Sequence, residues 1–293
     1  MTDKYEFIDG LKYAYPIARM CVWLSVSRSG FYEWRTRPLS ATEERRASLK
    51  DTIREIFDGS DQTYGYRRVH AALARQGRPA SPELVRALMR ELDLQPCQPR
   101  PWRVTTIPDP AAAATPDLVG RDFTAERPGA RMVGDITYIK TWAGWLYLAT
   151  VIDCYTKMVV GYAMADHMRA SLVTAAIEMA VRRMDLPVGA VFHSDRGCQY
   201  SSAEFRACLR ERGIAASVGR TGVCWDNAMA ESFNGTLKNE RVYRTVYPTR
   251  EHAQADIANY IEIFYNRRRL HSGLGYRTPH EVYDEYQNRQ IVA

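Results

Sequence analysis

The sequence lacks C-x-x-C pairs and long apolar runs. Its six cysteines are scattered over 293 residues, a spacing that provides neither a zinc-ligand pattern nor the dense framework of a small disulfide-bonded protein. No apolar stretch approaches the ~20 residues that a membrane-spanning helix needs. Residues 1–16 also lack the uninterrupted apolar segment of a signal peptide. We therefore expect reduced thiols and a cytoplasmic protein without membrane contact.

The composition is that of a globular protein. Hydrophobic residues make up 46% and charged residues 25% of the chain, which excludes a disordered or fibrous class. A chain of 293 residues is long for one domain, so two or three units are expected. The net charge of +6 permits a polyanionic partner without establishing one.

Changes of sequence texture predict the domain boundaries. Helical spacing recurs from residue 13 onward, so residues 1–103 are expected to form a helical region, and the prolines and alanines of residues 104–130 predict a linker. Residues 131–247 begin with apolar strands and continue with alternating helices and strands, whereas residues 248–293 predict a helical extension. This order predicts an all-α region followed by an α/β domain.

The helical region carries the basic residues expected of a DNA-binding unit. Residues 60–103 contain eight arginines and four acidic residues. Ser81 and Pro82 predict the start of a helix that exposes Arg86 and Arg90, and an earlier helix carries Arg67 and Arg68. A helix, a turn and a second helix with outward arginines fit a major groove. Residues 99–103 are interpreted equally well as a phosphate-tracking arm or as a solvated linker.

Three acidic residues of the α/β part lie on different predicted elements. Asp135 occurs within the apolar strand 131–141, Asp195 follows the strand 190–192, and Glu231 lies on a helix opened by Asp226. Taken singly, such residues are usually surface acids at caps and turns. An unpaired charge inside an apolar strand is costly, however, and carboxylates are the ligands that Mg²⁺ prefers.

Four further groups have competing interpretations. Asp153 ends an apolar strand, where a turn or cap role is favoured over metal ligation. His193 precedes Asp195 by two residues and is expected to form a hydrogen bond or contact DNA rather than act as a base. Cys198 lacks an activating pattern, so an inert thiol is favoured over a nucleophile. The fourth group is a basic-aromatic patch that contains Arg267, Arg268, Arg269 and His271. Either two of the three consecutive arginines reach DNA, or the patch is a solvated helix end.

Four motifs together resemble a known family. DITYI, HSDRGCQY, DNAMAES and YNRRRLHSGLGYRTP are similar to the orfB-type transposases of the IS-three insertion-sequence family, a DDE type with a retroviral-integrase-like core. The resemblance implies an RNase H-like mixed sheet. It also implies a catalytic triad of Asp135, Asp195 and Glu231, in which 35 residues separate Asp195 from Glu231. It also implies a DNA-contacting Lys238 and a helix-turn-helix in residues 13–37, where spacing alone favours a plain helical hairpin.

The expected function is therefore DNA transposition. Two Mg²⁺ (or Mn²⁺) ions held by the triad would support cleavage of the element ends and strand transfer by transesterification. The expected partners are terminal-repeat and target DNA, further copies of the chain, and an upstream-frame DNA-binding protein joined by frameshift; the expected location is the cytoplasm, at the nucleoid when acting. Two alternatives stay open at this point: a catalytically inactive end-binding repressor, and an RNase H-like metal nuclease that does not join strands.

Overall fold

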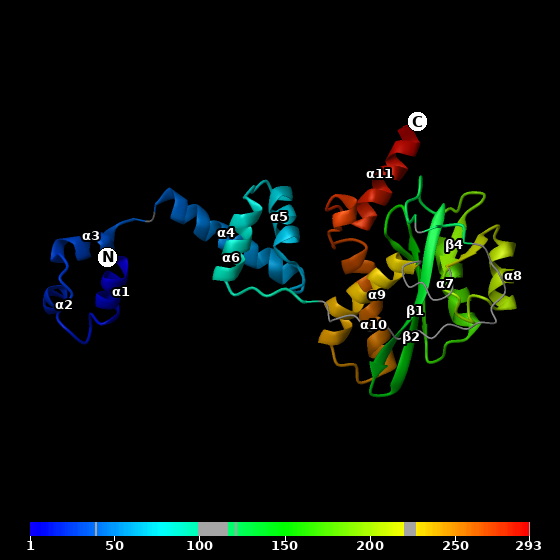
Figure 1. The fold of residues 1–293 in the computed structure, drawn as a ribbon, viewed down its shortest axis with the longest axis horizontal. Coiled ribbons are helices and arrows are strands. Elements are labelled where there is room, and N and C mark those ends of the chain that lie inside the picture. Colours follow the sequence, from blue (N-terminus) through cyan, green and yellow to red (C-terminus); the bar gives the residue numbers. More distant parts are fainter. Residues whose placement is uncertain (39, 99–116, 121, 220–226, 293) are drawn as a thin grey trace.

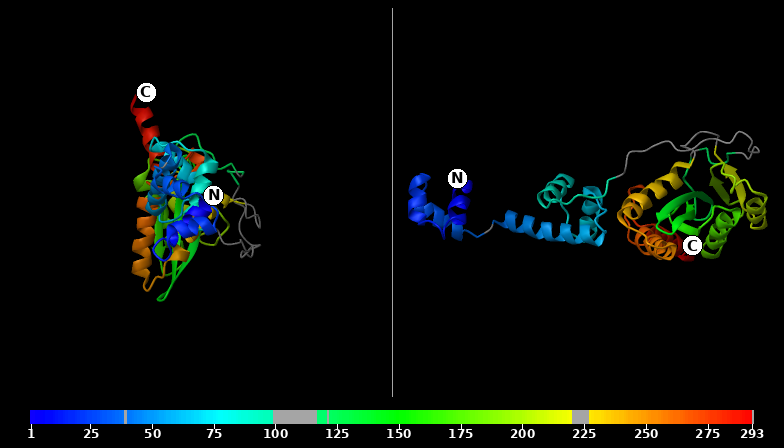
Figure 2. Two further views of the ribbon diagram at one scale, coloured as in Figure 1. Left: turned by 90° about the vertical axis from the view of Figure 1, so that its left-hand side faces the viewer. Right: turned by 90° about the horizontal axis from the view of Figure 1, so that it is seen from below.

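The computed structural model describes residues 1–38, 40–98, 117–120, 122–219 and 227–292, and it consists of two small helical bundles followed by an α/β core (Figure 1). The three parts follow one another along the long axis of the molecule, with the N-terminal bundle farthest from the core (Figure 2). Residues 99–103 and most of the predicted linker lie outside the described residues. Within the described part of the chain, no helix is long and apolar enough to cross a membrane.

The first bundle contains α1 (Thr2–Gly10), α2 (Ile17–Trp23) and α3 (Arg28–Thr36). Its small core forms around Phe31 and Ile8, which are both fully buried. The Ser27 side chain accepts a hydrogen bond from the Gly30 amide at the start of α3, as an N-cap residue does. The helix pair is thus found where the resemblance placed it, and α1, which the sequence did not predict, completes the bundle.

The second bundle contains α4 (Ala41–Gly59), α5 (Tyr66–Arg75) and α6 (Pro82–Glu91). Ser40 and Glu43 form a reciprocal capping box at the start of α4. Ser81 caps α6 and Pro82 occupies its first turn, as predicted. The chain passes between α5 and α6 through Gly77, whose φ of +69° suits glycine.

The core is built on a five-stranded sheet in the order β3-β2-β1-β4-β5. The strands are β1 (Arg131–Thr141), β2 (Gly144–Asp153), β3 (Val159–Ala165), β4 (Val191–Ser194) and β5 (Ala215–Val218). The first three pair antiparallel, and β4 and β5 run parallel to β1. Both faces of the sheet are covered, which explains why β2 is almost wholly apolar. The predicted mixed sheet is confirmed.

Helices form a layer on each face of the sheet (Figures 1 and 2). On one face lie α7 (Ala170–Arg183) and α8 (Ala203–Glu211). A side chain at Gly161 of β3 would collide with the backbone of Ala176, so this glycine permits the close approach of α7. On the other face lie α9 (Ala228–Glu240), α10 (Arg250–Asn259) and the π-helix η3 (Tyr260–Tyr265). The short 3₁₀ turn η2 (Val242–Arg244) lies between α9 and α10, and a second one, η4 (Ser272–Leu274), precedes α11 (Pro279–Val292).

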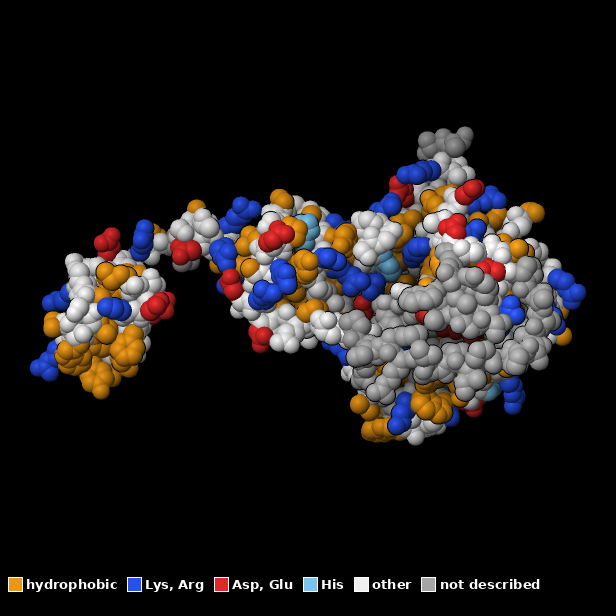
Figure 3. Space-filling model, in the orientation of Figure 1, with side chains coloured by type: hydrophobic (Ala, Val, Ile, Leu, Met, Phe, Trp, Pro, Cys, Tyr) orange, Lys and Arg blue, Asp and Glu red, His pale blue; other side chains and the backbone are white. Residues whose placement is uncertain are grey.

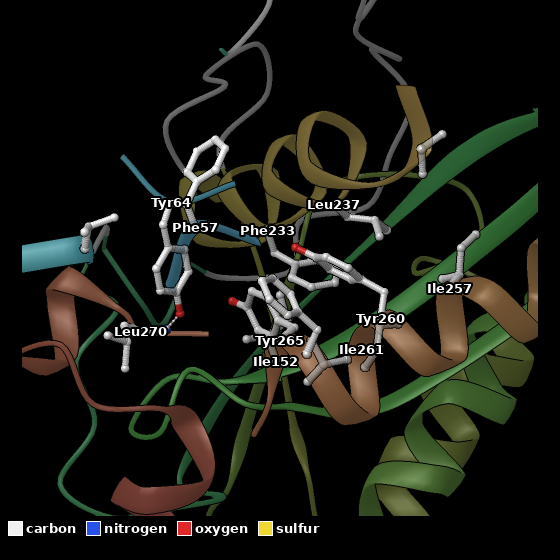
Figure 4. Packing of buried hydrophobic residues seen from close by; sticks show 14 of the residues in the cluster. Phe57, Tyr64, Ile152, Phe233, Leu237, Ile257, Tyr260, Ile261, Tyr265 and Leu270 are labelled. Atoms are coloured by element: carbon white, nitrogen blue, oxygen red, sulfur yellow. Dashed lines mark hydrogen bonds between the residues drawn. The ribbon is translucent and has the colours of Figure 1, made fainter. Parts of the chain in front are cut away.

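The second bundle is attached to the C-terminal part of the core. The Tyr64 hydroxyl donates to the Arg268 carbonyl at 3.0 Å and accepts from the Leu270 amide at 2.8 Å. Phe57 and Tyr64 of the bundle belong to the same buried cluster as Phe233 of α9 (Figure 4). The bundle is therefore anchored beside the helix that carries Glu231.

Candidate active site

Asp135 lies in the middle of β1 on the face that α9 covers. One carboxylate oxygen accepts from the Ile136 amide, and the other accepts from the Asn234 side-chain amide of α9, both at 2.8 Å. Burial, followed by the negative charge of Asp195, raises the pKa of Asp135 to about 7. The cost of an isolated buried carboxylate is expressed here as a shift towards the protonated form.

Asp195 is brought towards Asp135 by the parallel pairing of β4 with β1. The last paired residues are Val133 and His193, so the chain turns away into Asp195 at the level of Asp135. A side chain at Gly134 would overlap the Phe192 ring, so Gly134 allows β4 to pack this closely. The Gly197 amide donates to Asp195 at 3.0 Å. Burial of the Asp195 carboxyl nevertheless raises its pKa.

Glu231 lies in the first turn of α9, exposed at the edge of the site. Desolvation and the charge of Asp195 raise its pKa. The predicted N-cap, Asp226, lies outside the described residues; the cap position is Asn227, whose side chain makes no capping bond. The side-chain amide of Asn227 instead donates to the Gly134 carbonyl at 3.0 Å. Asn227 and Asn234 therefore tie α9 to β1 on either side of Glu231.

Within the part of the chain that the structure describes, three buried polar atoms near these acids have no hydrogen-bond partner: the Tyr200 hydroxyl and the side-chain oxygens of Asn227 and Asn234. Burial, followed by the charges of Asp135 and Asp195, raises the pKa of Tyr200, so its hydroxyl lies within electrostatic reach of both acids. Unsatisfied buried polar groups are rare in proteins. Their presence beside three carboxylates of raised pKa fits a site that takes up cations and their water.

Asp135, Asp195 and Glu231 supply the carboxylate oxygens that a hard divalent cation prefers. Their side chains are not yet arranged around a common point. Each of the three acids is shifted towards its protonated form, and nearby negative charge contributes to the shift at Asp135 and Glu231. A bound cation would reverse that effect. Among the described residues, no three acidic, histidine or cysteine side chains stand close enough together to form a ready-made metal cage. The acids share one region of the sheet, and closing around an ion requires their side chains to move.

Lys238 extends from α9 to the edge of β1. Its ammonium lies 4.6 Å from the centre of the Tyr138 ring, a cation–π distance. Burial lowers the pKa of Lys238, and the charge of Asp135 opposes that shift. Lys238 therefore has an aromatic partner in the protein, which the sequence did not indicate, and it lies within electrostatic reach of the acids.

The alternative polar candidates have structural partners. Asp153 is fully buried and accepts from the amides of Gly129 and Thr156 at 2.8 and 2.7 Å, which fits the predicted turn role. His193 is also fully buried, and its Nδ1 lies 2.8 Å from the Ser217 hydroxyl, as a hydrogen-bonding role requires. Cys198 is exposed.

The arginines of the second bundle fall into two groups. Arg67, Arg86 and Arg90 are exposed, and the first two lie 5.7 Å from the ring of Tyr66 between them. Basic side chains gather on the visible face of this bundle (Figure 3). Arg68 instead faces the core: its Nε donates to the Leu270 carbonyl at 3.0 Å, and burial lowers its pKa. For Arg68, the structure replaces the predicted DNA contact by a contact between bundle and core.

The C-terminal basic patch also divides. Arg267 and Arg268 are exposed, whereas Arg269 is buried and binds Glu240 through two hydrogen bonds of 2.8 and 2.6 Å. Burial and the charge of Arg269 lower the pKa of His271 to about 3, which keeps the ring neutral. The prediction of a DNA contact is corrected for Arg269, because a buried guanidinium paired with a carboxylate is not free to bind phosphate. The DNA contact of His271 stays a prediction.

Glu240, the last residue of α9, is the centre of a buried charged cluster that the sequence did not predict. Besides Arg269, it accepts from the Tyr260 hydroxyl at 2.8 Å, and Arg68 approaches it to 3.6 Å.

Asn234 was within reach of prediction, because it shares a helix face with Glu231. No pattern in the sequence indicated Tyr200.

Family models match three segments of the chain. Residues 125–224 and 212–279 each match an "Integrase core domain", and residues 43–102 match an "HTH-like domain". These matches cover the acid-bearing sheet, the following helices and the second bundle.

Curated relatives cover nearly the whole chain. It is 39% identical over 267 residues to the "Insertion element IS600 uncharacterized 31 kDa protein" of Shigella sonnei, covering 91% of this chain and 98% of the relative. It is 35% identical over 292 residues to "Transposase InsF for insertion sequence IS3A" of Escherichia coli K12, covering 99% and 100%. A solved catalytic core domain of BIV integrase covers 56% of this chain and 99% of its own, at 18% identity and a TM-score of 0.43.

Proposed function

Because the chain belongs to the family of IS3 insertion-sequence transposases, we propose that Asp135, Asp195 and Glu231 are the residues that perform its catalysis. As a member of this family it is a DNA transposase of the DDE type, for which divalent-metal dependence is typical. The observation that supports the residue assignment is that three carboxylates, on β1, directly after β4 and on α9, have raised pKa values and lie within electrostatic reach of one another. Mg²⁺ or Mn²⁺, two ions to a site, is the proposed cofactor.

The three carboxylates would hold the cations, which when bound activate the attacking oxygen and stabilise the leaving oxygen of phosphoryl transfer. Asn234 fixes the orientation of Asp135 through its 2.8 Å hydrogen bond, and the Gly197 amide does the same for Asp195. Such chemistry depends mostly on positioning and charge. The chain's own contribution is therefore to keep three mutually repelling acids in one place.

The proposed DNA contacts follow exposure and charge. Arg86 and Arg90 lie on the second helix of the helix-turn-helix pair, with Arg67 beside them, and are proposed to meet the element end. Arg267 and Arg268 are proposed to meet phosphate. Lys238 is proposed to leave the Tyr138 ring for a phosphate near the cut. Assembly of several copies on DNA, at the nucleoid, and fusion to an upstream-frame protein are proposals that follow from the resemblance.

The test of the triad is an oligonucleotide assay for 3′-end cutting and for strand transfer in Mg²⁺. Asp135→Asn, Asp195→Asn and Glu231→Gln keep side-chain shape but remove charge, and each is expected to abolish both steps while end binding in Ca²⁺ persists. Asp166→Asn, an exposed acid after β3, is the matched control and should act like the wild type. Near-normal joining by any triad variant would refute the assignment of that residue.

A second readout does not depend on activity. If the acids hold cations, Mg²⁺ should raise the unfolding midpoint of the wild-type protein, because a ligand that binds only the folded state stabilises it. The same titration should have little effect on Asp135→Asn. An equal response of the two proteins would remove Asp135 from the cation site.

A further inference from the structure

The hairpin formed by β1 and β2 presents aromatic side chains on one face. Tyr138 is opposite Tyr147 in the register, so Trp145, two residues earlier on β2, lies diagonally across from Tyr138 on the same face. The rings of Tyr138 and Trp145 are 5.2 Å apart in an edge-to-face arrangement. Their exposed fractions are 52% and 46%, and Trp142 at the turn is 76% exposed.

The opposite face of the same hairpin is part of the core. Ile139 and Leu146 are fully buried there, against the layer of α9 and α10. Hydrophobic side chains are also visible at the lower end of the core, where the hairpin ends (Figure 3). The aromatic residues are thus not required to close the sheet, and large rings left in water usually mark a binding surface.

The surroundings of the two rings are cationic. Lys238 of α9 lies 4.6 Å from the Tyr138 ring centre. Lys140 is exposed two residues beyond Tyr138, on the same face. The guanidinium of Arg250 donates to the Trp145 carbonyl at 3.1 Å. Aromatic rings bordered by cations favour a nucleic-acid strand over an apolar protein surface.

The position of the rings identifies which part of the DNA they would meet. Tyr138 follows Asp135 by three residues, so its side chain leaves the opposite face of β1 about 10 Å along the strand. Lys238 follows Glu231 by seven residues, about 10.5 Å along α9, and reaches the Tyr138 ring around the edge of β1. Strand and helix thus lead together from the acids to the rings. A distance of about 10 Å corresponds to about three nucleotides of a stacked strand, at ~3.4 Å each.

We propose that Tyr138 and Trp145, which we call the hairpin platform, stack on an unpaired base within about three nucleotides of the phosphate that is cut. The proposal rests on the proposed active site, because the nearness of Asp135 is what makes DNA the occupant. A stacked base would share the platform with Lys238 or release its ammonium to the adjacent phosphate. Stacking tolerates any base, so the platform would hold a frayed end without reading its sequence.

The experiment compares two DNAs in Ca²⁺, where binding needs no chemistry. Both carry the terminal sequence of the element with a three-nucleotide single-stranded flank, and in one of them the three flank positions are abasic. The wild-type protein should bind the intact flank ~5- to 140-fold more tightly, the equivalent of about 1–3 kcal/mol. Tyr138→Ala and Trp145→Ala should bind both DNAs as the wild type binds the abasic one.

Two variants serve as controls. Tyr138→Phe keeps the ring and should keep the preference for the intact flank. Tyr286→Ala removes a comparable ring pair, because Tyr286 lies 5.6 Å from Tyr155 beyond the other end of β2, and it should also keep the preference. The wild-type comparison needs no variant, so misfolding of an alanine variant cannot hide the answer.

The outcomes separate this proposal from the proposed function. If the wild type does not distinguish the two flanks, or if both alanine variants retain the distinction, the hairpin platform is refuted while cutting in Mg²⁺ is unaffected. If affinity falls equally on both DNAs, the rings support the fold or a phosphate contact, and base stacking is likewise refuted. Conversely, cutting by Asp135→Asn would refute the triad and leave the base preference standing.

Discussion

Arg269→Ala is expected to destabilise the protein strongly rather than to weaken DNA binding. The Arg269 and Glu240 side chains are each only 6% exposed, and the substitution leaves the Glu240 carboxylate buried without its main partner. Removing one member of a buried ion pair costs about 3–5 kcal/mol. The Tyr260 hydroxyl remains at 2.8 Å and Arg68 at 3.6 Å, which places the expected loss near the lower end, about 3 kcal/mol.

Chemical or thermal unfolding measures this loss directly. At about 2–4 °C per kcal/mol for a protein of this size, the midpoint should fall by roughly 6–12 °C. Arg268→Ala is the matched control, because Arg268 is the exposed neighbour and surface substitutions usually change stability by less than about 0.5 kcal/mol. A double variant, Glu240→Met with Arg269→Met, should recover most of the loss, since an apolar pair of similar volume can replace a buried ion pair.

DNA binding supplies the result that would refute this reasoning. If Arg269→Ala unfolds at the wild-type midpoint, and if its affinity for DNA depends less steeply on salt by about one phosphate contact, then Arg269 binds DNA as the sequence had suggested. The same salt titration on Arg268→Ala is expected to show that shallower slope without a loss of stability.

Three further outcomes follow from the described contacts. Alanine at Arg86 or Arg90 should cost about 1–3 kcal/mol on the element end and little on random DNA in a binding titration, and equal losses would indicate phosphate contact alone. The pKa of His271 is lowered to about 3 in the fold, so between about pH 6.5 and pH 3 the unfolded chain binds one more proton than the folded protein. The free energy of unfolding should therefore fall by up to ~1.4 kcal/mol per pH unit as the pH drops through this range. Unfolding curves of His271→Asn should lack this slope. The pKa of Asp135 is raised to about 7, so its carboxyl favours the fold at low pH and this contribution is lost as pH rises to about 7; Asp135→Asn should therefore unfold at a higher midpoint than the wild type at pH 8 without divalent cations, and Mg²⁺ should narrow the gap.

The elements of the core could be predicted because their sequence patterns are strong. The apolar run of residues 131–141 predicted β1 with the bounds that the structure has, and the helix predicted to carry Glu231 is α9. The acids could be proposed because Asp135 interrupts an apolar strand. What pairs with each acid depends on the tertiary fold, so the hydrogen bond from Asn234 and the nearby Tyr200 hydroxyl required the structure.

The error at Arg269 has a local cause in the backbone. Counting at 3.6 residues per turn cannot decide which of three consecutive arginines faces inward. Residues 260–265 form a π-helix, in which the Asn266 amide bonds to the carbonyl five residues earlier, at Ile261. A wider turn shifts every later side chain around the axis. The Arg269 amide likewise bonds to the Phe264 carbonyl five residues back, and its side chain enters the core.

The charged cluster around Glu240 joins the helix-turn-helix bundle to the helix that carries Glu231. Helix α9 carries Glu231 in its first turn and Glu240 at its last residue, so the helix that carries the proposed catalytic acid ends in the cluster. Arg68 comes to Glu240 from α5 of the helix-turn-helix bundle, while Arg269 comes from the C-terminal region. A buried ion pair holds its partners in one arrangement because any other arrangement leaves a charge unpaired. The basic residues that the sequence assigned to DNA therefore divide by burial: the exposed ones are the proposed DNA contacts, and Arg68 and Arg269 instead pair with Glu240 at the end of α9.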